Sequence, residues 1–142
     1  QTLQTRLFPL ATVVTPNIPE AQALTSVEGV GVRAIQEMAR RIFNSGAKNV
    51  VIKGGHRRGP ATDILYDGSV FLEFPAARIR TKNTHGTGCT FAAALACGLA
   101  RRLPVEVAVA AAKEFVTQAI RRAFAIGAGH SPVNHFYSSF TD

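Results

Sequence analysis

The pattern between residues 32 and 52 does most to narrow the folds open to this chain. Apolar residues recur at helical spacing on one face of 32–43, and Gly46 then provides a stop for the helix. Next comes Val50–Ile52, a short continuous apolar run typical of a strand that is covered on both faces. A helix followed by a covered strand indicates the α/β class, in which helices pack on a sheet.

The same reasoning predicts the remaining elements. They are a buried strand at Leu10–Val14, a helix at Pro19–Leu24, a hairpin of Asp63–Tyr66 and Val70–Phe74, and helices from about Gly88 to Arg101 and Val105 to Phe124. This order predicts a mostly parallel sheet with helices on both faces. In such sheets ligands bind outside the carboxyl ends of the strands, so polar clusters that follow strands mark the expected site.

Composition excludes several classes of protein. The 142 residues suit one domain, and 46% hydrophobic residues supply a core, which excludes wholesale disorder. The longest small and apolar run, Cys89–Ala100, is shorter than the roughly 20 residues of a membrane-spanning helix. A net charge of +7 favours anionic partners such as nucleotides, phosphorylated metabolites, nucleic acid or acidic lipid. Two cysteines, too far apart on one helix to bridge, indicate a reducing, cytoplasmic setting.

The most informative polar cluster is residues 81–90, TKNTHGTGCT, which leads into an alanine-rich helix. Gly86 and Gly88, with Thr87 between them, allow a tight turn, and a helix that begins there offers unpaired N–H groups to an anion. Cys89 at this helix start is placed where thiolate formation is favoured, so it is a candidate nucleophile or base. The alternative is an ordinary glycine loop with a small buried cysteine.

Two further clusters follow the predicted strands. Asn17 and Glu20 are spaced to face one side of a helix start, where an amide and a carboxylate suit a hydrated Mg²⁺. The alternative is helix capping by the same two residues. Lys53, in Lys53–His56, follows a buried strand and can contact phosphate as a point charge; the alternative is a solvated lysine before a glycine turn. The four histidines show no metal-ligand spacing.

Taken in this order, the clusters resemble the hydroxymethylpyrimidine/phosphomethylpyrimidine kinases of thiamine biosynthesis, a family of the ribokinase-like superfamily. The matching segments are TPNIPEA at 15–21, KGGH at 53–56, the segment 81–90 and the ending GHSPVNHF at 129–136. The resemblance implies a three-layer α/β/α fold with a mostly parallel sheet, and phosphoryl transfer from ATP with Mg²⁺. The implied acceptors are 4-amino-5-hydroxymethyl-2-methylpyrimidine and then its monophosphate.

The resemblance also implies roles for single residues. Gly86–Cys89 match the anion-hole motif of the family, and Cys89 stands at its catalytic position, where it would act as the base. The other implied roles are organisation of Mg²⁺ and its waters by Asn17 and Glu20, contact with the transferred phosphate by Lys53, and proximity to the nucleotide for Lys113. A homodimer is the family expectation.

Members of the family are nearly twice as long as this chain. We therefore expect residues 1–142 to be the C-terminal, nucleotide-binding and catalytic-loop part of a ribokinase-like kinase domain, without the half that holds most of the pyrimidine pocket. Two alternatives stay open: pyridoxal kinase activity on the same scaffold, and a non-catalytic nucleotide-binding fragment. Cys89 and the lead-in at 83–85 favour the thiamine enzyme. A nucleic-acid partner is not expected, since no aromatic platform accompanies the basic residues, and a membrane partner is not expected either.

Overall fold

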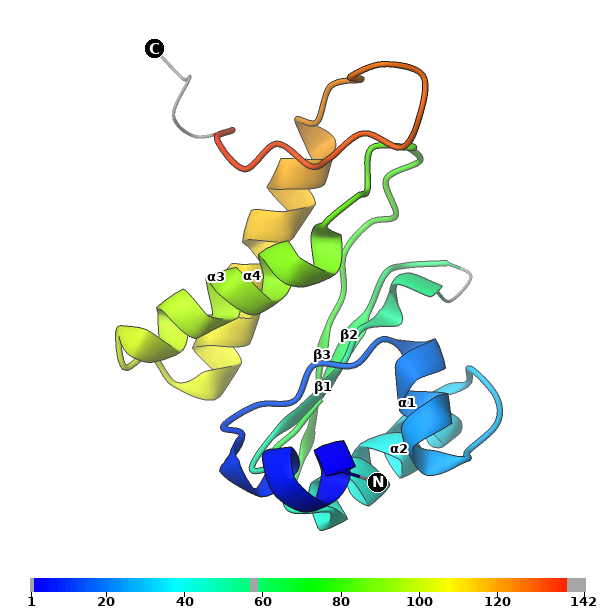
Figure 1. The fold of residues 1–142 in the computed structure, drawn as a ribbon, viewed down its shortest axis with the longest axis vertical. Coiled ribbons are helices and arrows are strands. Elements are labelled where there is room, and N and C mark those ends of the chain that lie inside the picture. The colour runs from blue at the N-terminus through cyan, green and yellow to red at the C-terminus, as the bar shows by residue number, and fades with distance from the viewer. Residues whose placement is uncertain (1, 57–58, 138–142) are drawn as a thin grey trace. The chain divides into compact units, whose positions relative to one another are not determined.

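The computed structural model describes residues 2–56 and 59–137, which form two compact units divided between Arg78 and Ile79 (Figure 1). The first unit contains a π-helical turn (Leu3–Leu7), 3₁₀ turns (Phe8–Leu10 and Gly54–His56), helices α1 (Ile18–Thr25) and α2 (Val32–Asn44), and strands β1 (Val50–Ile52), β2 (Asp63–Tyr66) and β3 (Phe71–Phe74). The second unit contains helices α3 (Thr87–Ala100) and α4 (Val105–Arg121).

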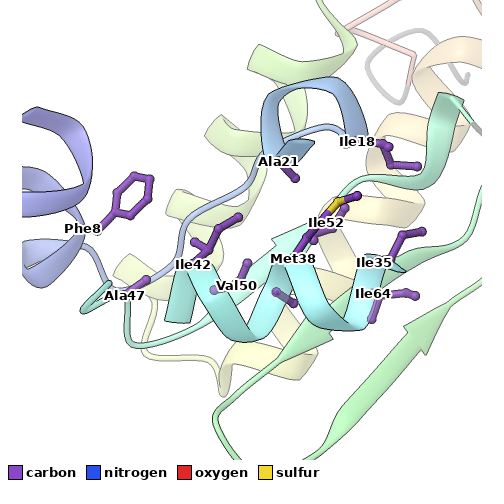
Figure 2. Close-up of a cluster of buried hydrophobic side chains, with 11 residues drawn as sticks. Phe8, Ile18, Ala21, Ile35, Met38, Ile42, Ala47, Val50, Ile52 and Ile64 are labelled. Atoms are coloured by element: carbon purple, nitrogen blue, oxygen red, sulfur yellow. The ribbon is translucent and has the colours of Figure 1, made fainter. Parts of the chain in front are cut away.

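The core of the first unit lies between α2 and the sheet. The apolar stripe predicted for α2 is confirmed, because Ile35, Met38 and Ile42 are at most 1% exposed, and α2 packs against β1 and β2. Figure 2 shows these side chains together with others from α1, the N-terminal turns and the strands. Gly46, just past the end of α2, has φ +106°, in the left-handed region that glycine favours, as the predicted stop requires.

The three strands form one antiparallel sheet in the order β1-β2-β3. The predicted hairpin is confirmed, with β2 and β3 joined around Asp67 and Gly68. The Asp67 carboxylate accepts hydrogen bonds from the backbone N–H groups of Ser69 and Val70, both at 2.8 Å. These bonds, with that to Val70 the stronger influence, hold the pKa of Asp67 below its ordinary value of 3.8.

The strand predicted at Leu10–Val14 is wrong. Leu10 ends a 3₁₀ turn that begins with the buried Phe8, and its side chain is 79% exposed. The segment after it is extended and runs parallel to β1: the N–H of Val14 donates to Asn49 O at 3.0 Å, and the N–H of Val51 donates to Val14 O at 2.8 Å. The next ladder bond on this side requires an N–H from residue 16. That residue is Pro16, which has none, so pairing is reduced to isolated bridges.

The expectation of a mostly parallel sheet is also not met within the described residues. All three named strands pair antiparallel, and parallel pairing is limited to isolated bridges at Val14, Asn17 and His85. The helices α1 and α2 and the short strands that follow them agree with the α/β class.

In the second unit α3 packs against α4 (Figure 1). Their contact is close at Gly98, where a Cβ would lie 2.9 Å from the Cβ of Ala108, so a larger residue would push the helices apart. The predicted stripe on α4 is confirmed, since Val109, Ala112 and Val116 are buried, although α4 ends at Arg121, three residues before the predicted end at Phe124. None of the helices in the described part of the chain has the length and apolar character needed to cross a bilayer.

Candidate functional site

The start of α3 has the backbone geometry that an anion-binding turn requires. Gly86, the residue before the helix, has φ +83°, and no side chain caps the helix. A Cβ at Gly86 would meet nothing within 4 Å, so conformation rather than space selects glycine here. Among the described residues, nothing accepts a hydrogen bond from the N–H groups of Gly88 and Cys89. These two donors and the positive end of the helix dipole can stabilise a bound anion.

Cys89 lies in the first turn of α3 and is exposed. The alternative of a small buried cysteine is therefore wrong. Cys97 is also exposed, and both thiols are free, as the sequence predicted. An exposed thiol beside two open N–H groups can approach the same ligand that those groups bind.

Thr90 closes the turn from inside the helix. Its backbone N–H and its hydroxyl both donate to the carbonyl oxygen of Gly86, each at 2.9 Å. No role was predicted for Thr90 from the sequence. The hydroxyl also lies 2.8 Å from Nε2 of His135, a residue considered only as a metal ligand. The sequence did contain a hint of a role for His135, because the segment 129–136 matches the C-terminal ending of the family. The match did not assign a function to any residue in that segment.

Asn17 and Glu20 form a complete capping box at the start of α1. The N–H of Glu20 donates to Asn17 Oδ1 at 2.8 Å, and the N–H of Asn17 donates to Glu20 Oε2 at 2.7 Å. The capping alternative is thus confirmed. It leaves the exposed Glu20 carboxylate with one oxygen, Oε1, that no hydrogen bond uses within the described residues. The box therefore satisfies the helix end and still presents negative charge at its surface.

Lys53 lies beside this capping box. Asn17 and Lys53 form a parallel bridge, and the N–H of Lys53 donates to Pro16 O at 2.9 Å, so two clusters that are far apart in sequence meet at one edge of the sheet. The Lys53 side chain is half-buried. After it, Gly54 is held against β2: its N–H donates to the buried carboxylate of Asp63 at 2.8 Å, and a Cβ on Gly54 would lie 1.8 Å from Thr62 O.

The predicted residues thus form two groups, one in each unit. Asn17, Glu20 and Lys53 come together in the first, and Gly86–Cys89 form the turn in the second, with Lys113 half-buried on α4. No group of three or more His, Cys, Asp or Glu residues within the described ranges is arranged to hold a metal ion by itself. The first group combines a carboxylate and a lysine, and the second combines open N–H groups and a thiol. Both combinations suit phosphate chemistry.

Comparison with protein families matches residues 1–134 to the phosphomethylpyrimidine kinase family. The thiamine biosynthesis bifunctional protein ThiED of Geobacter sulfurreducens is 51% identical over 138 residues, which are 96% of this chain and 28% of that protein. The hydroxymethylpyrimidine/phosphomethylpyrimidine kinase of Haemophilus influenzae is 47% identical over 141 residues, which are 94% of this chain and 52% of that protein. The chain spans about half the length, or less, of the curated relatives it matches.

Solved structures give the same result for the fold. The ADP complex of Bacillus subtilis pyridoxal kinase matches with a TM-score of 0.93 at 40% identity. The match covers 99% of this chain and 54% of the pyridoxal kinase chain. The phosphomethylpyrimidine kinase from Clostridium difficile matches with a TM-score of 0.69 at 34% identity. The match covers 83% of this chain and 47% of the Clostridium difficile chain. These similarities confirm the predicted ribokinase-like class and the expectation that the chain corresponds to part of such a fold.

Proposed function

This chain belongs to the phosphomethylpyrimidine kinase family, and we propose that it is the nucleotide-binding and catalytic-loop part of an ATP-dependent kinase of thiamine biosynthesis. The proposed acceptors are 4-amino-5-hydroxymethyl-2-methylpyrimidine and its monophosphate. One observation carries the proposal: the start of α3 presents the open N–H groups of Gly88 and Cys89 beside an exposed thiol.

In phosphoryl transfer the protein takes little part in covalent chemistry. Its main contributions are to position the reacting groups and to stabilise their charge. In this proposal the N–H groups of Gly88 and Cys89 bind the equatorial oxygens of the transferring group, where negative charge is spread. Donors fixed in a helix backbone need no reorganisation during the reaction, which is what makes them effective. From the family resemblance we also assign Lys53 a contact with phosphate and Lys113 a place near the nucleotide.

Cys89 is the proposed base for the first phosphorylation. As a thiolate it would accept the proton of the acceptor hydroxymethyl group, and exposure at the helix start gives a bound substrate access to it. In the second phosphorylation the acceptor is already an anionic phosphate and requires less deprotonation. We therefore assign Cys89 a larger role in the first step than in the second.

The residues at the start of α1 fit a hydrated Mg²⁺ better than a directly coordinated one. Asn17 Oδ1 and Glu20 Oε2 already accept hydrogen bonds in the capping box, while Glu20 Oε1 remains open. Mg²⁺ commonly keeps several waters and takes only one or two carboxylates, so Glu20, supported by Asn17, would hold the ion through its waters. When bound, the ion would neutralise part of the negative charge on the phosphate groups.

Pyridoxal phosphorylation is the second candidate function. The observation that favours it is the high similarity to pyridoxal kinase structures, with TM-scores of 0.93 and 0.92 for the Bacillus subtilis and Staphylococcus aureus proteins. A non-catalytic nucleotide-binding fragment is the third.

One experiment separates these functions. The natural polypeptide that carries this sequence is assayed for ADP release from MgATP with the pyrimidine, its monophosphate and pyridoxal as separate acceptors, and its intact mass is measured in the same sample. Turnover with both pyrimidines is the expected result. Turnover with pyridoxal alone would replace the proposal by the second function. A mass of 15.1 kDa with AMP-PCP binding and no turnover would replace it by the third.

A further inference from the structure

We propose that His135 is a positioning residue for the α3 turn: through the Thr90 hydroxyl it fixes the Gly86 carbonyl, and so sets the direction of the N–H groups of Gly88 and Cys89. The inference rests on the proposed function for its effect on catalysis, but not for its effect on the turn. It gives a role to a histidine in the C-terminal segment, which follows α4 and is far from the turn in sequence.

The contacts form a short chain of hydrogen bonds. Thr90 is 5% exposed, and its hydroxyl lies 2.9 Å from Gly86 O and 2.8 Å from His135 Nε2. A hydroxyl has one hydrogen, and the carbonyl of Gly86 can only accept, so both contacts are satisfied together when Thr90 donates to Gly86. His135 must then donate to Thr90, which requires the proton on Nε2. The imidazole therefore donates to the hydroxyl, and the hydroxyl donates to the carbonyl.

A second set of contacts holds the neighbouring residue of the turn. The N–H of His85 donates to Ser131 O and the N–H of Val133 donates to His85 O, both at 3.2 Å, which forms a parallel bridge between the two segments. Ser131 is itself 1% exposed, and its hydroxyl accepts from Ile126 N at 2.7 Å and donates to Ile126 O at 3.1 Å. Residues 131–135, hereafter the strap, therefore contact the chain on both sides of Gly86, at His85 before it and at Thr90 after it.

The strap is attached to the end of α4. The N–H of Asn134 donates to Ala119 O at 3.0 Å, and its side-chain amide donates to Arg122 O at 3.2 Å. Carbonyl groups in the last turn of a helix have no partner within the helix, so these bonds satisfy groups that would otherwise be open. Because α4 packs against α3, the strap joins the end of one helix to the beginning of the other within the second unit.

The turn needs such support because its own residues do little to fix its backbone conformation. Gly86 has no Cβ, no neighbour within 4 Å of the place where one would stand, and no side-chain cap on the helix it precedes. Glycine has the widest conformational freedom of all residues. The two hydrogen bonds to its carbonyl, from the N–H and hydroxyl of Thr90, are what restrict it. His135 restricts the hydroxyl rotor that makes one of them.

The test uses His135→Ala and His135→Gln in the natural polypeptide, since the Gln amide places an N–H donor close to the position of Nε2. Amide hydrogen exchange at residues 86–90 is measured first, without substrate. We expect faster exchange of the Thr90 N–H, which donates to Gly86 O, in His135→Ala, with no change in the rest of α3 and α4, and near wild-type exchange in His135→Gln. Thr90→Val should match His135→Ala. His130→Ala is the control, because the one hydrogen bond of the His130 ring within the described residues is with Lys82 O, outside the turn.

Kinetics follow on the same variants. A displaced catalytic turn costs up to about a hundredfold in rate, so we expect a loss of about tenfold or more in kcat for His135→Ala, an ATP KM close to wild type, and recovery in His135→Gln. Unchanged exchange in His135→Ala, or faster exchange over the whole of α3 and α4, would overturn the inference. If the wild-type polypeptide shows no kinase activity, the proposed function fails, and the exchange data still decide the role of His135.

Discussion

Asn17, Glu20 and Lys53 are positioned by a packed core, whereas Gly86–Cys89 are positioned by hydrogen bonds. In the first unit, α1 and β1 begin and end against fully buried side chains such as Ile18 and Ile52 (Figure 2). In the second, the glycine turn is followed by a helix whose first turn is partly exposed and is held by Thr90 and the strap.

The difference has a consequence for mutation. A closely packed core is sensitive to lost side-chain volume. A turn held by a few hydrogen bonds contributes little to overall stability, but small shifts in it change the direction of catalytic donors. Substitutions in the first unit should therefore act mainly on the free energy of unfolding, and substitutions at the α3 turn mainly on rate.

The largest effect is expected from Cys89→Ala. Loss of a general base typically costs 10²–10⁴-fold in rate, or about 3–5 kcal/mol of activation free energy, and we expect this loss in the first phosphorylation and a smaller one in the second. The free energy of unfolding should change by less than about 0.5 kcal/mol, because the side chain is exposed. Cys97→Ala, which changes another exposed cysteine on the same helix, is the matched control. Equal losses in both steps would contradict the assignment of Cys89 as base.

Met38→Ala tests the other side of the comparison. Met38 is fully buried between α2 and the sheet, so its truncation should lower the free energy of unfolding by about 2–5 kcal/mol, measured by urea denaturation. Turnover per folded molecule should stay close to wild type. Val32→Ala on the same helix, where the side chain is 39% exposed, should cost less than about 1 kcal/mol and serves as the control. A large loss of turnover in folded Met38→Ala would break the distinction between the two regions.

Much of the first unit could be predicted because its signals are local. The apolar stripe on α2, the end of that helix at Gly46 and the hairpin turn at Asp67 each depend on residues that are close together in the sequence. The strand at Leu10–Val14 failed because apolar character was given more weight than the two prolines that flank it, Pro9 and Pro16. Pro9 lies in a 3₁₀ turn, and Pro16 removes the N–H that would continue the ladder.

The site was predicted in part for the same reason. The capping box and the glycine turn are short motifs, and their positions were identified correctly, but spacing alone left both capping and metal binding open for Asn17 and Glu20. The contact between Thr90 and His135 joins residues 45 positions apart. It depends on how α3, α4 and the strap pack together, which no local pattern encodes.

Asn17→Ala sharpens the comparison because this residue belongs to the packed unit and to the proposed Mg²⁺ site. Loss of the cap should lower the free energy of unfolding by about 1 kcal/mol and raise the Mg²⁺ concentration needed for half-maximal rate. Asn17→Ser keeps an oxygen that can cap the helix and should recover the stability. If Asn17→Ser also recovers the wild-type Mg²⁺ requirement, the amide has no part in organising the ion, and its role is capping alone.

The smallest effect is expected at Asp67, where hydrogen bonds act at the surface of the packed unit. Its carboxylate accepts from the N–H groups of Val70 and Ser69, which lowers its pKa in the folded state. A group whose pKa is lowered by folding stabilises the fold above its unfolded value, and that contribution disappears as the pH falls through the lower, folded value. Asp67→Asn should therefore be slightly less stable than wild type at neutral pH. The difference should vanish as the pH is taken through and below 3.8, as followed by urea denaturation at each pH. A difference that persists unchanged in acid would show that the hairpin turn depends on the geometry of residue 67 rather than on its charge.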